Sequence, residues 1–293
     1  RAAWAWSRDG DTRVLAPPGD YLLSAGHSWR HGRVEDVLVT LVEGEDTELV
    51  VILPEIVPRD GWLGVDTHLH GAPSFDGALP MEDRLITCAA TGVDLPVTTD
   101  HDRQADYRAL STALGLDGRM QVVPGVEVTT ILRGHFNLFP IDPRPRNRVN
   151  GGALSWWEQT DTTEGLFERM RAAAGPDAIL QVNPPRTPGM FDFAGYDPET
   201  ATAGRETHFS WDFELFELWN GGVEDREELR ADWFSMLDRG IPAVPTGVSD
   251  SHYRYIPCGM GRTDVWLDET DPAAADVDAL VAALESGQVV VAA

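Results

Sequence analysis

The stretch WLGVDTHLHGAPSFDG, residues 62–77, is an apolar run that ends in two histidines at alternate positions. Side chains at every second position of a β-strand point to the same face, so Asp66, His68 and His70 share one face of a predicted strand. A helical segment, PMEDRLITCAATG at 80–92, follows, and then a second apolar run, VDLPVTT at 93–99. A strand, a helix and another strand in this order predict an α/β fold built on a parallel sheet.

The same alternation continues to the end of the chain. Apolar runs typical of strands recur at 120–128, 135–140, 178–184, 213–220 and 241–248, and helical segments occupy 104–115, 163–175, 224–240 and 272–287. Several of these helical segments begin with proline or an acidic residue and end with glycine, as helices commonly do. About seven strands alternating with helices predict a barrel with its helices outside.

The first 60 residues have a different pattern. Short apolar or alternating runs lie at 20–26, 34–44 and 47–57, separated by turns rich in Gly, Asp and Glu, and no helical period intervenes. These runs predict a small antiparallel β-domain at 1–60. The remaining residues, 61–293, then form the larger domain, because a chain of this length exceeds what one small core needs.

The composition limits the classes of function. The chain has 293 residues, 42% of them hydrophobic, and a net charge of −25 from 48 acidic and 23 basic residues. This charge disfavours nucleic-acid binding, and no apolar run is long enough to cross a bilayer. We therefore expect a small-molecule substrate, no nucleic acid and no membrane. The absence of lysine from the sequence excludes catalysis through a lysine Schiff base.

The compartment is less well defined by the sequence. Cys88 and Cys258 are the only cysteines, and two are too few to indicate a disulfide framework. The first residue is Arg1 rather than methionine, which leaves room for a removed leader. We expect a soluble protein and favour the cytoplasm slightly over secretion.

Further histidines and carboxylates lie in or at the ends of predicted strands, and Asp76 follows the first pair of histidines. The residues in or at the strands are Asp100, His101, Glu127, His135, Asp250 and His252. Glu127 is inside an apolar run, where a buried carboxylate is costly without a cation. In barrels of alternating strands and helices, the carboxyl ends of the strands carry the chemistry. Polar strand-end residues held by hydrogen bonds are the alternative, but the whole set favours a metal site. Imidazole and carboxylate ligands suit zinc, manganese or iron.

The motifs DTHLH, TTDH, GVEVT, GHFNLFP and GVSDSH, in this order, resemble those of the polymerase and histidinol phosphatase (PHP) superfamily. Together with PPGDYLLSAG and ELWNGG they are similar to the CehA/McbA branch of metallohydrolases, whose named member cleaves the carbamate ester carbaryl. The resemblance covers nearly the whole chain. It implies a distorted (β/α)7 PHP barrel, preceded by a small antiparallel β-domain and holding up to three metal ions at strand ends.

The resemblance also implies the ligands of each ion. One ion would be held by His68, His70, Glu127 and Asp250. A second would be held by Asp76, His101 and His252. Glu127 would bridge towards a third ion beside His135, but Asn183 and Pro184 occupy the positions where the family has a further histidine. We therefore expect two divalent ions rather than three.

These features predict an enzyme. A bound cation lowers the pKa of its water from about 16 towards about 7, which supplies hydroxide as the nucleophile. We expect a metal-dependent hydrolase of ester bonds that prefers phosphodiesters or triesters to monoesters, because a monoester dianion gains most from every nearby cation. An aryl ester or carbamate hydrolase using the same site is one alternative. A non-catalytic metal-binding domain is another.

Other residues are candidates for supporting roles. Arg186, after the run at 178–184, is predicted to bind a phosphoryl or carbonyl oxygen, with an ion pair to a nearby carboxylate as the alternative. Asp100 and Asp66 are predicted to accept hydrogen bonds from neighbouring imidazoles and so to orient them. Candidates for an apolar substrate pocket, with core packing as the alternative, are Trp156, Trp157 and Trp219.

Overall fold

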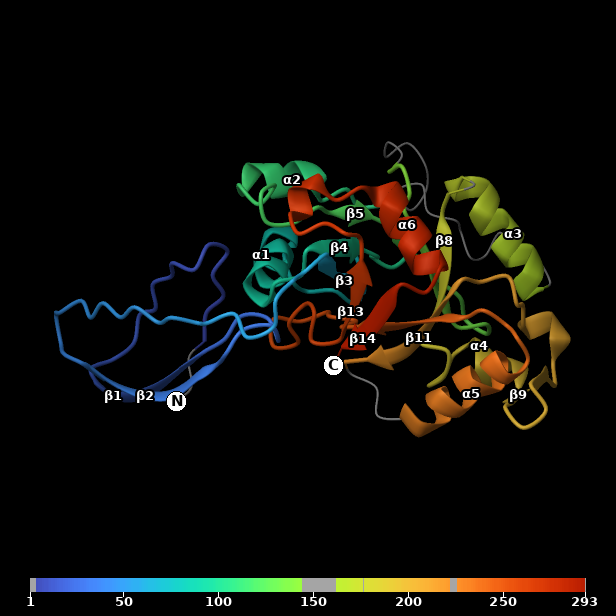
Figure 1. Cartoon of the computed structure of the whole chain (residues 1–293), viewed down its shortest axis with the longest axis horizontal. Helices are drawn as coiled ribbons and strands as arrows, with labels where there is room; N and C mark the ends of the chain where they lie inside the picture. Colours follow the sequence, from blue (N-terminus) through green and yellow to red (C-terminus); the bar gives the residue numbers. More distant parts are fainter. Residues whose placement is uncertain (1–3, 144–161, 176, 222–225, 293) are drawn as a thin grey trace.

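A computed structural model describes residues 4–143, 162–175, 177–221 and 226–292. The predicted combination of helices and strands is confirmed. The N-terminal hairpin of β1 (Gly19–Ala25) and β2 (Val34–Leu41) extends away from an α/β body, at the left of Figure 1. The body contains two five-stranded sheets, ordered β14-β13-β3-β4-β5 and β12-β11-β8-β7-β6.

Each apolar run predicted after residue 60 contains at least one strand. The first sheet consists of β3 (Trp62–Leu69), β4 (Leu95–Thr98), β5 (Val123–Pro124), β13 (Arg262–Trp266) and β14 (Val289–Ala292). The second consists of β6 (Val126–Thr129), β7 (His135–Phe139), β8 (Ile179–Asn183), β11 (Leu215–Asn220) and β12 (Val244–Val248). Strands β13, β14 and the short pair β9 (Tyr196–Asp197) and β10 (Thr202–Ala203) are additional to the predicted ones.

The sheets are mixed, which corrects the expectation of a parallel sheet. Strands β3, β4 and β5 run parallel, as do β8, β11 and β12, but β7 is antiparallel to both β6 and β8. Only residues 130–134 join β6 to β7, and so short a connection cannot make the crossover that parallel strands need. As a result, His135 at the start of β7 pairs with Thr129 and Asn183 at the ends of the neighbouring strands.

The closed (β/α)7 barrel is not confirmed, because the strands of the described residues form no closed sheet. The two sheets nevertheless meet at both sides. On one side β12 contacts β3, and the Thr263 hydroxyl bonds to the backbone of Gly247. On the other side only Gly125 separates β5 from β6. Single bridges between Leu69 and Ser251, and between residues 101 and 127, bring strand ends of both sheets to one edge.

Helices cover the outside of the sheets. They are α1 (Met81–Thr91), α2 (Arg108–Ala113), α3 (Thr163–Ala174), α4 (Met190–Ala194), α5 (Arg226–Asp238) and α6 (Val277–Glu285), with 3-10 turns η2 (Glu206–His208) and η3 (Pro272–Ala274). Gly92 ends α1 in the left-handed region, at φ 69°, which glycine adopts without strain. In the described part of the chain, no helix is long and apolar enough to span a membrane.

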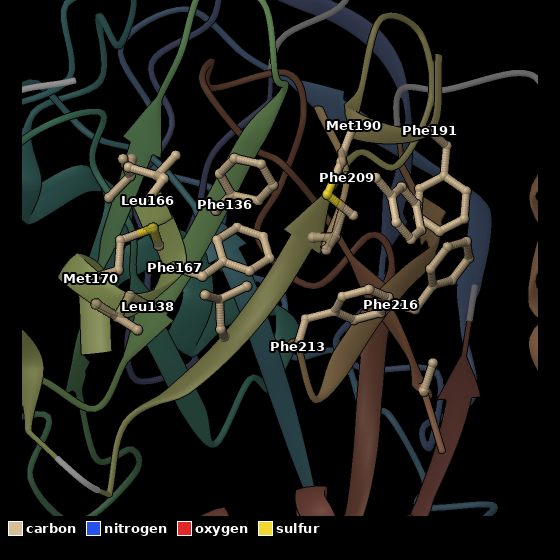
Figure 2. Close-up of a cluster of buried hydrophobic side chains, with 14 of the residues drawn as sticks. Phe136, Leu138, Leu166, Phe167, Met170, Met190, Phe191, Phe209, Phe213 and Phe216 are labelled. Atoms are coloured by element: carbon tan, nitrogen blue, oxygen red, sulfur yellow. The ribbon is translucent and has the colours of Figure 1, made fainter. Parts of the chain in front are cut away.

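A cluster of buried hydrophobic side chains fixes the second sheet against α3 and α4 (Figure 2). Phe136 of β7 meets Phe167 of α3 edge to face, with ring centroids 4.7 Å apart. Phe191 of α4 meets Phe216 of β11 in the same manner at 5.4 Å. Each such side chain contributes about 1.5–3 kcal/mol through burial. This packing holds β7, β8 and β11 in place under the polar residues at their ends.

The N-terminal region differs from the three predicted strands. Residues 47–57 form no strand, and only Glu55 makes a single bridge, to His31. Leu22 and Leu38 face each other across the hairpin and remain 66% and 68% exposed. No second layer of the described residues covers this face of the hairpin, whereas the apolar residues of its other face are half-buried. The division into 1–60 and 61–293 stays a prediction.

Cys88 of α1 and Cys258 form a disulfide, which the sequence analysis does not predict. Their Cα atoms lie 5.0 Å apart, within the usual range for such a bond. The two cysteines are 170 residues apart in the sequence, so only the fold brings them together.

Candidate metal centre

All eight residues predicted as metal ligands come together at one edge of the sheets. The strand ends of β3, β4, β6 and β12 and the start of β7 supply most of them, and the loop after β3 supplies another. The residues are His68, His70, Asp76, His101, Glu127, His135, Asp250 and His252.

The first group, here called the inner cluster, consists of His68, His70, Glu127 and Asp250. Nε2 of His68 lies 3.3 Å from a carboxylate oxygen of Glu127 and 3.3 Å from one of Asp250. Nε2 of His70 lies 3.2 Å from each of the same two carboxylates. Ligand atoms about 2.0–2.1 Å from a tetrahedral ion are about 3.3–3.4 Å from one another. The spacing of the inner cluster therefore fits a single divalent cation.

The second group, the outer cluster, consists of His70, Asp76, His101 and His252. Oδ2 of Asp76 lies 3.2 Å from Nε2 of His101 and 3.3 Å from Nε2 of His252. The His70 ring stacks on the rings of His101 and His252, with centroids 4.5 and 4.0 Å away. Asp76 is one-third exposed, whereas the side chains of His68 and Glu127 in the inner cluster are fully buried. The outer cluster is therefore the part of the centre nearest to solvent.

Several atoms of these clusters are buried without a hydrogen-bond partner. They are Nε2 of His68, Nε2 of His70, Nε2 of His252, Oε2 of Glu127 and Oδ1 of Asp76. Leaving one such atom unsatisfied costs about 1–3 kcal/mol. A cation between them would satisfy lone pairs of nitrogen and oxygen at once, so the donor set fits divalent metal ions.

A third group contains His101, Glu127 and His135. Nδ1 of His135 lies 3.2 Å from Oε1 of Glu127. The Asn183 side-chain amide donates to the same Oε1 at 2.5 Å and to Asn137 Oδ1 at 3.2 Å. Asn183 thus lies beside this group, but its N–H group donates a hydrogen bond and offers no lone pair to a metal. The third group has one ligand fewer than the resemblance implies.

The imidazoles are oriented by residues other than those predicted. Nδ1 of His68 lies 2.7 Å from Oε2 of Glu217, and Nδ1 of His70 lies 2.8 Å from the Ser74 hydroxyl. Nδ1 of His101 lies 2.7 Å from the Thr129 hydroxyl. The sequence analysis does not name Glu217, although it is a carboxylate inside an apolar run, as Glu127 is. The same argument from burial would have found it.

Asp66 and Asp100 stabilise the backbone near the ligands instead of orienting imidazoles. Asp66 accepts hydrogen bonds from the backbone N–H groups of Ser249 and Gly259, at 3.1 and 2.8 Å. Asp100 accepts from the Gly71 N–H at 2.7 Å and from the Tyr107 hydroxyl at 2.9 Å. Both carboxylates are buried. The predicted contact of each with an imidazole is therefore wrong, and each joins segments distant in sequence.

Burial and charge set the protonation of the inner cluster. Burial lowers the pKa of the His68 imidazole, but Asp250, Glu127 and Glu217 together raise that pKa well above its usual value. Burial lowers the pKa of His70 to about 3, so its imidazole is neutral. Burial raises the pKa of Glu127, yet the surrounding histidines hold it well below its usual value. A neutral imidazole and an ionised carboxylate are the forms that bind metal.

Arg186 does not reach into the centre as a free cation. Its Nε and Nη2 donate to the two oxygens of the buried Asp232, at 2.6 and 2.8 Å. Its Nη1 lies 3.2 Å from Asp192 and 3.1 Å from Glu228. Every nitrogen of the guanidinium is engaged, so the predicted contact with substrate is not supported. The alternative interpretation, an ion pair with nearby carboxylates, describes the structure.

Exposed aromatic side chains lie beside the outer cluster. The Phe75 ring stacks on the His101 ring at a centroid distance of 4.7 Å and is 75% exposed. Tyr253 and Tyr255, just after His252, stack on each other at 5.3 Å. Of the tryptophans considered for a pocket, Trp219 lies on β11, and the other two, Trp156 and Trp157, lie outside the described residues.

Comparison with known proteins supports the fold. No protein-family model matches the chain, and no curated protein matches it. A two-domain protein from Bacteroides vulgatus ATCC 8482 that contains a predicted PHP-like metal-dependent phosphoesterase superposes with a TM-score of 0.53 at 19% identity. The match covers 79% of this chain and 64% of that protein, so the chain spans less than two thirds of its length.

Two further structures match less closely. PsfC from Pseudomonas syringae PB-5123 has a TM-score of 0.45 at 18% identity, over 74% of this chain and 87% of that one. A proposed metal-dependent phosphoesterase from Bifidobacterium adolescentis ATCC 15703 has a TM-score of 0.40 at 14% identity, over 67% and 90%. The chain shares its mixed α/β fold with the PHP-like protein of B. vulgatus, and each of its three histidine and carboxylate groups has side-chain atoms that could hold a metal ion.

Proposed function

We propose that the chain is a metal-dependent hydrolase of the PHP superfamily that cleaves phosphoesters with two divalent cations. The observation that carries this proposal is the inner cluster, where imidazole nitrogens and carboxylate oxygens lie 3.2–3.3 Å apart. The imidazole Nε2 atoms there are buried without hydrogen-bond partners. The likeness of fold to a PHP-like protein, and the two sheets that meet at both sides, support a distorted PHP barrel around this cluster.

Glu127 and Asp250 are placed to hold the cations that would carry out the hydrolysis. When bound, the cations lower the pKa of a water molecule and polarise the ester oxygen. Oε1 of Glu127 faces His68, while Oε2 faces both His70 and His101. Its carboxylate therefore stands between the inner cluster and Nδ1 of His101 and of His135, and suits a bridge between two cations. Asp250 completes the inner cluster from its left-handed backbone, at φ 46°.

Glu217 determines which nitrogen of His68 is available. A carboxylate accepts but does not donate, so with a cation bound at Nε2 the one proton left on the His68 ring would sit on Nδ1, beside Glu217 Oε2 at 2.7 Å. The lone pair is then on Nε2, facing Glu127 and Asp250. An acceptor behind a histidine ligand raises its basicity and fixes its ring. Glu217 is accordingly assigned to the inner cluster as a positioning residue.

The substrate that fits best is a phosphodiester or triester. A phosphomonoester dianion needs more positive charge than a diester, and the group beside His135 lacks one ligand. Arg186 is engaged by three carboxylates, and Arg262 donates to the carbonyls of Thr91, Gly92 and Gly259. The net charge of −25 also disfavours a dianion. A small ester, rather than a nucleic acid or a membrane, is the proposed partner.

Hydrolysis of aryl esters or carbamates, as in the CehA/McbA branch, is a second candidate. The exposed Phe75 ring beside His101 offers a face on which an aryl group can stack. The same ring can accept the aryl group of an activated phosphodiester. The two candidates therefore differ in the bond attacked and not in the shape of the leaving group.

A substrate panel tests the proposal. Purified protein loaded with Zn²⁺ or Mn²⁺ is assayed on p-nitrophenyl phosphate, bis(p-nitrophenyl) phosphate, an aryl phosphotriester, p-nitrophenyl acetate and an aryl carbamate. The expected result is metal-dependent turnover that is highest for the diester or triester. Faster turnover of the carboxyl esters would favour the second candidate. Metal binding without turnover of any of them would favour a non-catalytic metal-binding domain.

A further inference from the structure

Helix α1 contacts the metal centre through two side chains one helical turn apart. Arg84 and Cys88 occupy positions i and i+4 of α1, so they lie on the same face of the helix. Both are fully buried. Arg84 contacts the segment that begins at Ser251, and Cys88 is bonded to Cys258 in the same segment. This segment carries His252 of the outer cluster.

The Arg84 guanidinium joins the two ligand-bearing segments. Its Nε donates to the His70 carbonyl at 2.6 Å, and its Nη2 donates to the Ser251 carbonyl at 2.7 Å. Its Nη1 donates to the Ser251 hydroxyl at 2.5 Å. Burial lowers the pKa of Arg84 to about 10, so the group is still charged at neutral pH. Arg84 thereby links the backbone of His70 to that of Ser251, the residue directly before His252.

The disulfide ties the far end of the same segment. Residues 252–261 are turns, bends and irregular chain, with no helix or strand of their own. Cys258 is six positions after His252, and the Gly259 N–H donates to Asp66 at 2.8 Å. The disulfide holds Cys258 against α1, so the segment from Ser251 to Cys258 is fastened at both ends. Helix α1 thus holds both ends of the loop that carries His252. Arg84 holds the loop at Ser251, and Cys88 holds it at Cys258.

The two clusters depend on this loop to different degrees. Glu127 lies on β6 and His68 on β3, while the Asp250 N–H donates to the His68 carbonyl at 2.9 Å, directly after β12. The inner cluster is therefore held by sheet structure. The outer cluster takes Asp76 and His252 from loops, and the His252 ring is only partly buried.

We propose that α1 positions His252 through Arg84 and the Cys88–Cys258 disulfide, so that reduction of the disulfide weakens cation binding at the outer cluster and spares the inner one. The inference rests on the proposed function, because it takes both clusters to be metal sites. In the reduction, a phosphine and one water become a phosphine oxide, and the sulfur–sulfur bond becomes two thiols. Disulfides persist in oxidising compartments, so the complete centre belongs to such a compartment.

The test compares the full chain with and without a water-soluble phosphine, which avoids the metal binding of dithiol reductants. Protein loaded with Zn²⁺ is dialysed against a competing chelator, and bound zinc, free thiols and far-UV circular dichroism are measured. We expect about two zinc equivalents in the oxidised protein. After reduction the weaker site should lose affinity about tenfold or more, with the circular dichroism unchanged.

Four variants sharpen the comparison. Cys88→Ala with Cys258→Ala should show the weakened outer cluster without reductant and no response to it, which excludes zinc binding by the freed thiols. His252→Ala should hold about one equivalent, and reduction should remove no more. Arg84→Met should weaken the outer cluster more than Arg84→Lys, because lysine keeps the charge and part of the hydrogen bonding.

Unchanged affinity of both sites after reduction would overturn the inference, as would loss of both ions or loss of the circular dichroism signal. Failure of the oxidised chain to bind zinc at all would instead overturn the proposed function, which keeps the two conclusions separate.

Discussion

Oε2 of Glu217 lies 2.7 Å from Nδ1 of His68, and both side chains are buried. Glu217 belongs to β11 of one sheet and His68 to β3 of the other. The second carboxylate oxygen of Glu217 accepts from the Asn220 amide at 2.9 Å, so the group cannot turn away freely. The contact holds the His68 ring so that Nε2 faces Glu127 and Asp250.

Glu217→Gln should therefore weaken metal binding at the inner cluster by about 10–100-fold, because a neutral amide leaves the imidazole less basic and less firmly oriented. Competition with a chromogenic zinc chelator measures the affinity. Glu214→Gln is a suitable control, because Glu214 precedes the same strand but pairs with Arg171. Equal affinity in the Glu217 variant and the unaltered chain would remove Glu217 from the centre.

Glu127→Gln should reduce both the metal content and the turnover. The substitution keeps the shape of the side chain but removes the charge that lies between the two clusters, so two cations would repel each other with less screening. Elemental analysis after gel filtration gives the stoichiometry, and the preferred ester of the panel gives the rate. If two equivalents remain bound, the bridging carboxylate lies elsewhere.

Metal removal should lower the melting temperature. Three carboxylates are buried in or beside the inner cluster: those of Glu127, Glu217 and Asp66. Cations bind only the folded arrangement of the ligands, so they stabilise the folded state. A ligand present at 100 times its Kd stabilises the folded state by about 2.7 kcal/mol, which corresponds to several degrees. Differential scanning fluorimetry with a chelator and then with Zn²⁺ added back measures this shift. No shift in either direction would argue against ions at this centre.

Arg186→Met should destabilise the chain by about 3–5 kcal/mol, because the buried Asp232 then loses its partner. Denaturant unfolding measures the change. Arg186→Met combined with Asp232→Leu should recover much of the lost stability, since the pair is removed together. In folded protein the KM for phosphodiesters should stay the same. A KM that rises for anionic substrates alone would restore the predicted role in substrate binding.

Asn183→His tests the departure from the family motif. The Asn183 amide already lies beside Glu127, so an imidazole there would provide a ligand where the amide provides a donor. We expect metal content to rise from about two towards three equivalents, with a relative gain for phosphomonoesters. Pro184→His serves as a comparison, because it follows the end of β8. A strong preference for monoesters in the unaltered chain would contradict this interpretation.

Local patterns allowed much of the fold and centre to be predicted. His68 and His70 alternate along β3, and the period of a strand places both on one face whatever surrounds it. The strand-to-helix alternation likewise predicts α1, α3 and α5. The antiparallel direction of β7 is harder, because it depends on reading residues 130–134 as a tight turn rather than as part of a crossover.

The sequence by itself determined which side chains are able to bind metal and that they follow strand ends, because both properties depend on residues close together in the chain. Only the tertiary structure decided which partners these side chains meet. Glu217 beside His68, Asn183 beside Glu127 and the disulfide of Cys88 with Cys258 each join residues far apart in sequence. Such contacts depend on how the two sheets and α1 pack. Hydrophobic burial drives that packing and is not directional, so a local sequence pattern does not specify which distant residues meet.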